Sequence, residues 1–234
     1  GIDINSKKDG RTKYDRKLWD ILLGKVVPTG RNVFAVATTD AHQLDKVGCA
    51  WTDLCMPENN AENVKTCLQN GSFFAVSRYI KNEEELAQFS LETGIDWGTE
   101  FAQENRDDSI PAPKVTDVTV DENEDSITLT VENALTVHWI ADGEVIAVGN
   151  TIDLDDYSDK IGSYVRAEAF GEGGVLYTQA FTLDYEGAPA DDDNAIFFDF
   201  GNILTEIKYL LIEIGTSLPG GQLVYDYLTK QVTE

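Results

Sequence analysis

The sequence is poor in basic residues, with 18 Lys and Arg against 42 Asp and Glu and a formal charge of −24. Such a charge repels phosphate backbones and anionic membrane surfaces, which argues against a nucleic-acid partner. The imbalance is uneven, because residues 1–110 carry a net charge of 13 − 18 = −5 and residues 111–234 one of 5 − 24 = −19. This shift in composition predicts a domain boundary near the middle of the chain.

The sequence also lacks a long apolar run. No stretch of about 18 apolar residues occurs, so no membrane span is expected. No charged segment followed by an apolar one precedes the first predicted element, so a signal peptide is not visible. The chain begins at Gly1 without an initiator Met, as a processed or trimmed protein does. Its localisation is therefore left open, and a secreted or cell-surface protein stays compatible with the sequence.

Cysteine and histidine, the residues that most often bind transition metals, are scarce. Cys49, Cys55 and Cys67 are odd in number and cannot all pair within one chain. They contain no Cys-x-x-Cys motif, and His42 alone lies near them, so we interpret them as small, partly buried thiols and not as zinc ligands. The second histidine, His138, lies in a predicted strand and is interpreted as structural.

The first half of the chain alternates between the patterns of helices and strands, which is typical of an α/β layer. The run that precedes Asp40 is apolar on both faces, as in a buried strand of a parallel sheet. We expect helices over residues 14–23, 57–71 and 82–92, and strands over residues 2–4, 32–39 and 72–80.

Local signals predict where the first two helices begin and end. Gly24 is a stop signal for the first helix. The second should begin at Pro57 or Asn60 and end at Gly71. The side chains expected to face inward are Leu18, Ile21 and Leu22 in the first helix and Val64, Cys67 and Leu68 in the second.

The pattern changes after Pro111 and Pro113, where we place a linker. From residue 114 to residue 185 apolar and polar residues alternate, and turn residues recur about every 8 to 12 positions. This pattern predicts an antiparallel β-sandwich. A run of Asp residues and an amphipathic helical pattern follow. The predicted parts are therefore an α/β domain over residues 1–110, a sandwich over 111–187, and an acidic linker with a helical segment over 188–234.

One tripeptide, Asp40-Ala41-His42, follows the apolar run of the predicted second strand. In an extended chain, side chains two positions apart point to the same face, so a carboxylate and an imidazole would lie together. Such a pair can share a divalent ion such as zinc, manganese or iron, and α/β enzymes place their sites at the carboxyl ends of strands. The alternative is a polar strand end that carries no chemistry.

The tripeptide lies within an ordered series of motifs. In chain order these are a "WD.LL" helix, an apolar strand that ends in Asp-x-His, Gly48, a short strand, a helix that ends in "L.NG", and the strand "SFFAV". The series resembles the last part of the PHP domain, the polymerase-and-histidinol-phosphatase family of metal-dependent phosphoesterases. Upstream, "IDINS" is similar to the preceding strand of that family. The resemblance covers roughly residues 2–80.

This resemblance implies a distorted (β/α) barrel whose metal ions activate water to attack a phosphate ester. Asp40 and His42 match the family's Asp-x-His and would be ligands of a divalent metal ion, with a small phosphate ester as the substrate. The family's other ligands, an early His-x-His among them, precede the segment represented here. We therefore expect a partial PHP-type barrel remnant that is inactive as this chain, because most of the family's metal ligands are absent from it.

The second half resembles an immunoglobulin-like β-sandwich. "VHWIADGEVI" places Trp139 where that fold has its core tryptophan, and the Asp142-Gly143 turn that follows could form a hairpin. "DKIGSYVRAEAF" is similar to the tyrosine-corner strand, with Tyr164 as the corner. By this resemblance Arg166 takes the place of the second core cysteine, so no inter-sheet disulfide forms and the core rests on packing around Trp139.

Two functions of different class remain open. In the first, the parent protein is a PHP-like phosphoesterase with an immunoglobulin-like accessory domain, and this chain is its C-terminal portion. In the second, the chain is a non-catalytic binding, adhesion or assembly protein built from a degenerate PHP remnant and the sandwich. In either case half a barrel leaves an unpaired sheet edge and an uncovered apolar face, so we expect a homo-oligomer.

Overall fold

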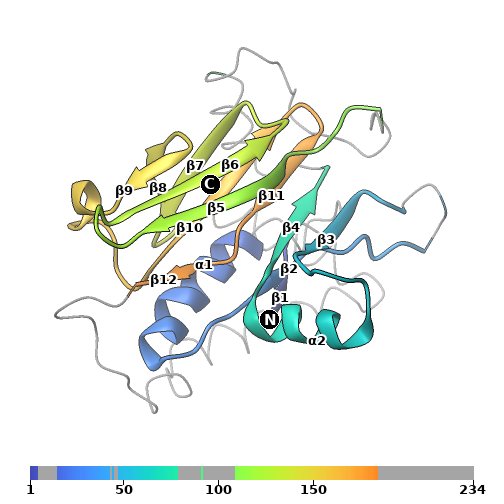
Figure 1. Ribbon diagram of the computed structural model, residues 1–234, viewed down its shortest axis with the longest axis horizontal. Helices are drawn as coiled ribbons and strands as arrows, with labels where there is room; N and C mark the ends of the chain where they lie inside the picture. Colours follow the sequence, from blue (N-terminus) through green and yellow to red (C-terminus); the bar gives the residue numbers. More distant parts are fainter. Residues whose placement is uncertain (5–14, 43, 45–46, 79–90, 92–108, 184–234) are drawn as a thin grey trace, which may run out of the picture. The chain divides into compact units, whose positions relative to one another are not determined.

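The computed structural model describes residues 1–4, 15–42, 44, 47–78, 91 and 109–183. Within this part the chain is mostly β-sheet with two short α-helices, and its strands close no barrel (Figure 1). The β-rich part of the expected fold is therefore present, whereas a PHP barrel remnant stays a prediction. The predicted helix over 82–92, Leu91 apart, and the predicted segment 188–234 lie outside the described residues.

The two halves of the chain differ in their elements. The first half contains β1 (Ile2–Asp3), α1 (Asp15–Val26), a 3-10 turn (Val27–Thr29), β2 (Ala35–Val36), β3 (Ala50–Leu54), α2 (Ala61–Asn70) and β4 (Phe73–Ser77). The second half contains β5 (Lys114–Asp121), β6 (Ser126–Glu132), β7 (Thr136–Ala141), β8 (Glu144–Val148), β9 (Thr151–Asp153), a 3-10 turn (Asp155–Tyr157), β10 (Tyr164–Gly171), β11 (Gly174–Tyr177) and β12 (Phe181–Thr182). No helix of the described residues is long and apolar enough to cross a membrane.

Helix α1 is present, but its predicted end and its predicted inner face are wrong. It continues through Gly24 to Val26. Leu18 and Ile21 are 47% and 49% exposed, because the face that packs on the protein is a different one. The buried side chains of α1 are Asp15, Arg16, Trp19, Asp20 and Leu23. Three of these five are charged, so hydrophobic periodicity selects the wrong side of this helix.

Helix α2 begins and ends as its sequence predicts. Asn60 caps its first turn by accepting a hydrogen bond from the Asn63 backbone N–H at 2.9 Å. Gly71 ends it with a φ of 71°, a left-handed conformation that glycine adopts without steric cost. Of the predicted inner residues Cys67 is buried, whereas Leu68 is exposed.

Three sheets organise the described residues. Seven strands form the largest sheet in the order β3-β4-β11-β10-β7-β8, with β12 also paired to β10, and β5-β6-β9 form a second sheet. All of these pairs are antiparallel. Only β1 and β2 pair in parallel, and β2 is much shorter than the strand predicted over residues 32–39.

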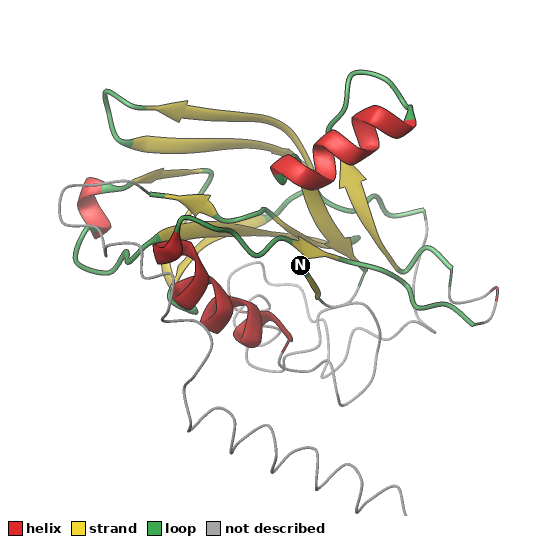
Figure 2. Ribbon diagram, turned by 90° about the horizontal axis from the view of Figure 1, so that it is seen from below, coloured by secondary structure: helices red, strands yellow, loops and turns green. Residues whose placement is uncertain are grey.

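The central strand β10 is buried along its whole length, because both faces of its sheet are covered. Val165, Ala167 and Ala169 face an apolar core that the β5-β6-β9 sheet completes. Tyr164 and Phe170 face a second core, which includes Trp19 and Leu23 of α1. Figure 2 shows the strands of the large sheet between α1 and the long strands β5 and β6.

The large sheet crosses the boundary predicted near residue 110. Strand β4 from the first half pairs with β11 from the second, with Ser77 opposite Val175. Gly174 permits this approach, because its φ is 137° and a Cβ there would collide with the Ser77 carbonyl. The domain boundary near residue 110 and the homo-oligomer stay predictions. The edge of β4 that could have attracted a second copy is paired with β11.

Two features predicted from the immunoglobulin resemblance are found and two are wrong. Trp139 is fully buried, and the β7–β8 hairpin turns at Asp142-Gly143, where both φ values are positive. Tyr164, however, donates from its hydroxyl to Asp20 in α1 at 2.9 Å and forms no tyrosine corner. Arg166 does not take the place of a core cysteine, because alternation along β10 turns it toward α1 and turns Ala167 toward the core.

Candidate functional site

Asp40 and His42 lie in an exposed turn beyond the end of β2. That strand ends at Val36, and Asp40 has a φ of 43°, so the chain leaves the extended conformation before it reaches the pair. The His42 Nδ1 atom lies 2.8 Å from the Asp40 carbonyl oxygen and 3.9 Å from its Oδ1 atom. The two residues therefore lie together, but through a local turn and not through the strand alternation that the sequence predicts.

The His42 contact defines which ring nitrogen is available to a ligand. A carbonyl oxygen only accepts hydrogen bonds, so Nδ1 must carry the hydrogen in the bond to Asp40. In the neutral ring the lone pair then lies on Nε2. The His42 side chain is 81% exposed and that of Asp40 is 44% exposed, so solvent ions can reach both groups. An imidazole held through Nδ1 by a backbone carbonyl is the usual arrangement of a metal-binding histidine.

The chain that leads into this turn is held by its neighbours. Thr38 donates from Oγ1 to Asp3 Oδ2 on the parallel strand β1 at 2.7 Å. The Thr52 hydroxyl of β3 accepts from the Ala37 backbone N–H at 3.2 Å and donates to the Ala37 carbonyl at 3.1 Å. Asp3 therefore joins the same edge as the predicted pair. Sequence reasoning missed it as a site residue, although its place at the end of a predicted parallel strand was the available signal.

The side chain of Gln179 connects β2 to the large sheet. Its Oε1 atom accepts from the Ala35 backbone N–H at 2.8 Å, and its Nε2 atom donates to the Ala35 carbonyl at 2.8 Å. Nε2 also lies 3.2 Å from the Phe73 carbonyl at the start of β4. Gln179 lies in the break between β11 and β12, and no local pattern in the sequence predicts this role.

His138 and Cys67, which the sequence does not predict to bind a metal, take part in other contacts. His138 is buried, and its ring centroid lies 4.9 Å from that of Phe170. The Cys67 thiol donates to the Cys55 carbonyl. Counting only the described residues, no three or more His, Cys, Asp or Glu side chains are grouped in a way that could hold a metal ion.

A second polar cluster is buried between α1 and β10. Arg166 donates from Nε and Nη2 to the two carboxylate oxygens of Asp20, both at 2.7 Å, and from Nη1 to Glu168. The guanidinium also lies 4.8 Å from the ring centroid of Trp19. These contacts satisfy the charge of Arg166 within the protein, so the cluster joins two elements and offers no open coordination position.

The cluster changes the protonation of its members in directions that follow from its geometry. Burial alone lowers the pKa of Arg166, but Asp20 and Glu168 raise it well above its ordinary value. Burial, followed by the Asp20 carboxylate, raises the pKa of Tyr164 above its usual range. Arg166 therefore stays charged and Tyr164 stays neutral at physiological pH, and neither is suited to proton transfer.

No family model, curated protein or solved structure matches this chain. The resemblances to the PHP and immunoglobulin-like folds therefore rest on the residues and motifs alone. The metal-binding role of Asp40 and His42 stays a prediction.

Proposed function

We propose that this chain is the C-terminal portion of a PHP-like metal-dependent phosphoesterase, with an immunoglobulin-like sandwich as its accessory domain. Asp40 and His42 contribute two ligands to a divalent zinc, manganese or iron ion. The observation that carries the proposal is the hydrogen bond from His42 Nδ1 to the Asp40 carbonyl, which leaves Nε2 to the metal.

The placement of the pair supports this function. It follows β2, which runs parallel to β1, and the carboxyl ends of parallel strands are where α/β enzymes hold their ligands. Asp3 adds a second carboxylate to the same edge through its contact with Thr38. These residue types suit a hard or borderline divalent ion.

The large sheet has a positioning role in this proposal. Gln179 holds both backbone groups of Ala35, and Thr52 holds both backbone groups of Ala37. The segment before the ligand turn is thereby fixed to the large sheet. Ligands that are held before the metal binds lose less conformational entropy when it arrives.

A bound metal ion would supply the activation of water for attack on a phosphate ester. Asp40 and His42 would bind and orient that ion. In the family that the chain resembles, further ligands precede the segment represented here. The chain itself should therefore bind metal weakly and hydrolyse no phosphate ester at a measurable rate.

A titration with Mn²⁺ followed by NMR tests the two ligands directly. The chain has two histidines, so each ring gives an assignable signal and His138 is an internal control. Paramagnetic Mn²⁺ should broaden the ring signals of His42 and leave those of the buried His138 sharp. Asp40→Asn should weaken Mn²⁺ binding at least about tenfold.

The matched control for Asp40→Asn is Asp117→Asn, which removes the same charge from an exposed position on β5. Sharp His42 signals at millimolar Mn²⁺, or equal losses in the two variants, would favour the non-catalytic binding, adhesion or assembly protein. A coding sequence upstream of Gly1 that lacks a His-x-His motif would remove the enzymatic part of the proposal.

A further inference from the structure

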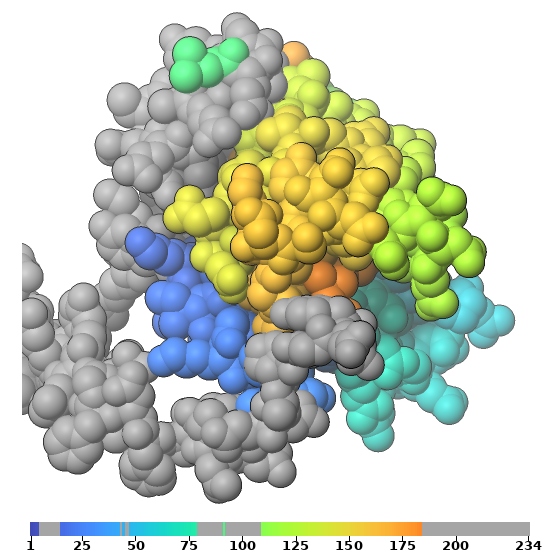
Figure 3. Space-filling model, turned by 90° about the vertical axis from the view of Figure 1, so that its left-hand side faces the viewer, coloured from blue at the N-terminus to red at the C-terminus, as the bar shows by residue number. Residues whose placement is uncertain are grey.

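A groove of about 1040 Å³ lies between the three-stranded sheet and the end of the large one. One wall is β5 with the turn that follows it, and Phe181 of β12 lies opposite. One end is closed by the C-terminal end of α2 and the first residues of β4. Figure 3 shows the orange surface of the last described residues between the yellow-green atoms of the sandwich and the teal atoms of the first half.

The β5 wall presents apolar side chains that the sandwich does not cover. Val118 and Val120 lie opposite Leu129 and Ile127 of β6, and residues opposite each other in a sheet share a face. Leu129 and Ile127 are buried in the sandwich core. Val118 and Val120 are nevertheless 37% and 55% exposed, so the core face of the sheet continues into the groove.

Strand β5 also has a free edge. In the part of the chain that the structure describes, β5 pairs with β6 alone. An edge strand exposes backbone N–H and C=O groups to which an extended peptide can add as a further strand. The groove therefore offers main-chain hydrogen bonds beside an apolar wall.

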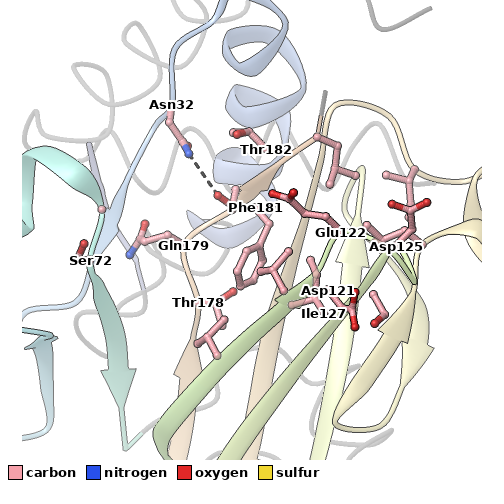
Figure 4. Close-up of a pocket in the computed structure, with 18 of the residues that line it drawn as sticks. Asn32, Ser72, Asp121, Glu122, Asp125, Ile127, Thr178, Gln179, Phe181 and Thr182 are labelled. Atoms are coloured by element: carbon pink, nitrogen blue, oxygen red, sulfur yellow. Dashed lines mark hydrogen bonds between the residues drawn. The ribbon is translucent and has the colours of Figure 1, made fainter. Parts of the chain in front are cut away.

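The charge of the groove has one sign. Among the described residues, its lining contains Asp121, Glu122, Asp125 and Asp155 and no Lys or Arg. Figure 4 shows the Glu122 carboxylate extending toward Phe181. On the outer face of β5, Asp117 alternates with the inner valines and accepts a hydrogen bond from Thr119 on that face.

We propose that this groove binds an extended peptide in which apolar and basic residues alternate. The peptide adds to the free edge of β5, with its apolar side chains beside Val118, Val120 and Phe181 and its basic side chains beside Asp117 and Asp121. Neighbouring side chains on one face of a sheet interact directly, and opposite charges stabilise such pairs. This site is independent of the metal site at Asp40 and His42.

A second copy of the chain is a poorer occupant than a basic peptide. The chain carries 42 acidic against 18 basic residues, so its copies repel one another. The carboxylates at the groove would add to that repulsion. Charge complementarity therefore favours a partner of opposite charge.

A labelled hexapeptide of alternating Val and Lys is the probe for this site. Fluorescence anisotropy with the full chain should show saturable binding that weakens as salt is added, since exposed charge pairs are screened. A Val/Glu peptide and a Ser/Lys peptide should each bind at least tenfold more weakly. Equal binding of the Val/Glu peptide would overturn the charge argument, and equal binding of the Ser/Lys peptide would overturn the apolar one.

Two valines provide a matched pair of variants that localises the site. Val120 in the groove and Val148 on β8 are 55% and 56% exposed, so a lysine is tolerated at both. Val120→Lys should weaken peptide binding at least tenfold, whereas Val148→Lys should change it less than twofold. If Val120→Lys does not fold, as judged by its NMR spectrum, Asp117→Lys on the outer face of β5 makes the same test.

Three further kinds of result would overturn the proposal. The first is a failure to localise binding to the groove, either because no saturable binding is seen or because the lysine variants inside and outside the groove have equal effects. The second is a dimer in sedimentation that Val120→Lys disrupts, which would assign the groove to a second copy. The third is a change in the NMR signals of residues 184–234 on Val120→Lys without peptide, which would assign it to the chain itself.

Discussion

The two faces of the large sheet are both buried, but they are built differently. Toward the β5-β6-β9 sheet, β10 presents Val165, Ala167 and Ala169, and the contacts there are apolar. Toward α1 the same strand presents Arg166 and Glu168, which form ion pairs in the interior. One strand therefore takes part in two kinds of core through alternate residues.

The difference shows what each face contributes to the fold. Apolar packing stabilises without fixing direction, and it tolerates changes that keep the volume. The two parallel hydrogen bonds between Arg166 and Asp20 require one orientation of α1, because a bidentate guanidinium contact has a fixed geometry. We infer that the apolar face, with Val165, Ala167 and Ala169, contributes most of the packing energy. The ionic face, with Arg166 and Glu168, fixes the orientation of α1.

The largest effect is expected from Arg166→Met. It leaves Asp20 and Glu168 buried without a cation, which should lower the free energy of unfolding by about 3–5 kcal/mol. Val165→Ala, the adjacent residue on the apolar face, should cost about 2 kcal/mol. Urea unfolding measures both.

A triple variant sharpens the same comparison. Combining Arg166→Met with Asp20→Leu and Glu168→Leu removes the unpaired charges and should recover more than half of the loss. The interpretation of the ionic face is contradicted if the triple variant is less stable than Arg166→Met alone, or if Arg166→Met costs no more than Val165→Ala.

A smaller loss of stability is expected from a change at Gln179, which joins β2 to the large sheet. Gln179→Glu keeps the size of the side chain but replaces its N–H donors with an oxygen, which then faces the carbonyls of Ala35 and Phe73. The lost hydrogen bonds and the repulsion should cost about 2–3 kcal/mol. Hydrogen exchange should accelerate at the Ala35 amide more than in β7. Equal acceleration in both strands would show that Gln179 does not hold β2 specifically.

The smallest effect concerns Asp142, at the rim of the ionic face. Partial burial, and then the Asp20 carboxylate, raise the pKa of Asp142. An acid whose pKa is raised on folding stabilises the folded state below its unfolded pKa and loses that contribution as pH rises through the folded pKa. Asp142→Asn should therefore leave the free energy of unfolding unchanged below about pH 4 and raise it slightly at pH 7, by less than about 1 kcal/mol because solvent screens an exposed charge.

Thermal unfolding of both proteins at pH 3.5 and pH 7 measures this difference. Asparagine is well suited to the left-handed turn position that Asp142 occupies, so backbone strain does not obscure the result. A gain that is the same at both pH values would show that the turn conformation, and not the charge, is responsible.

The parts of the fold that the sequence predicts are those with local signals. Asn60 and Gly71 mark the ends of α2, and the turn at Asp142-Gly143 marks the β7–β8 hairpin. Each signal acts through the conformation of the residue itself or of its immediate neighbours. Period-two alternation likewise indicates the strands of the second half, because it reflects the pleat of a single strand.

The parts that the sequence does not predict depend on partners far away in the chain. The inner face of α1 is set by Asp20 and Arg166, which are 146 residues apart. The role of Gln179, which lies between β11 and β12, is not predictable from neighbouring residues, because its partner Ala35 is far away in the chain. The proximity of Asp40 and His42 follows from their spacing of two residues, but the positive φ that forms their turn is not evident from the sequence.

The pairing of β4 with β11 has a consequence for the synthesis of the protein. Ser77 and Val175 pair across a sequence separation of 175 − 77 = 98 residues. At about 5–20 residues per second, a ribosome needs about 5–20 s after it has made β4 to reach β11. During that interval the edge of β4 has no permanent neighbour, and open strand edges attract other chains. We therefore expect the yield of soluble protein to depend on a low growth temperature, or on chaperones that bind the nascent chain until β11 has emerged from the ribosome.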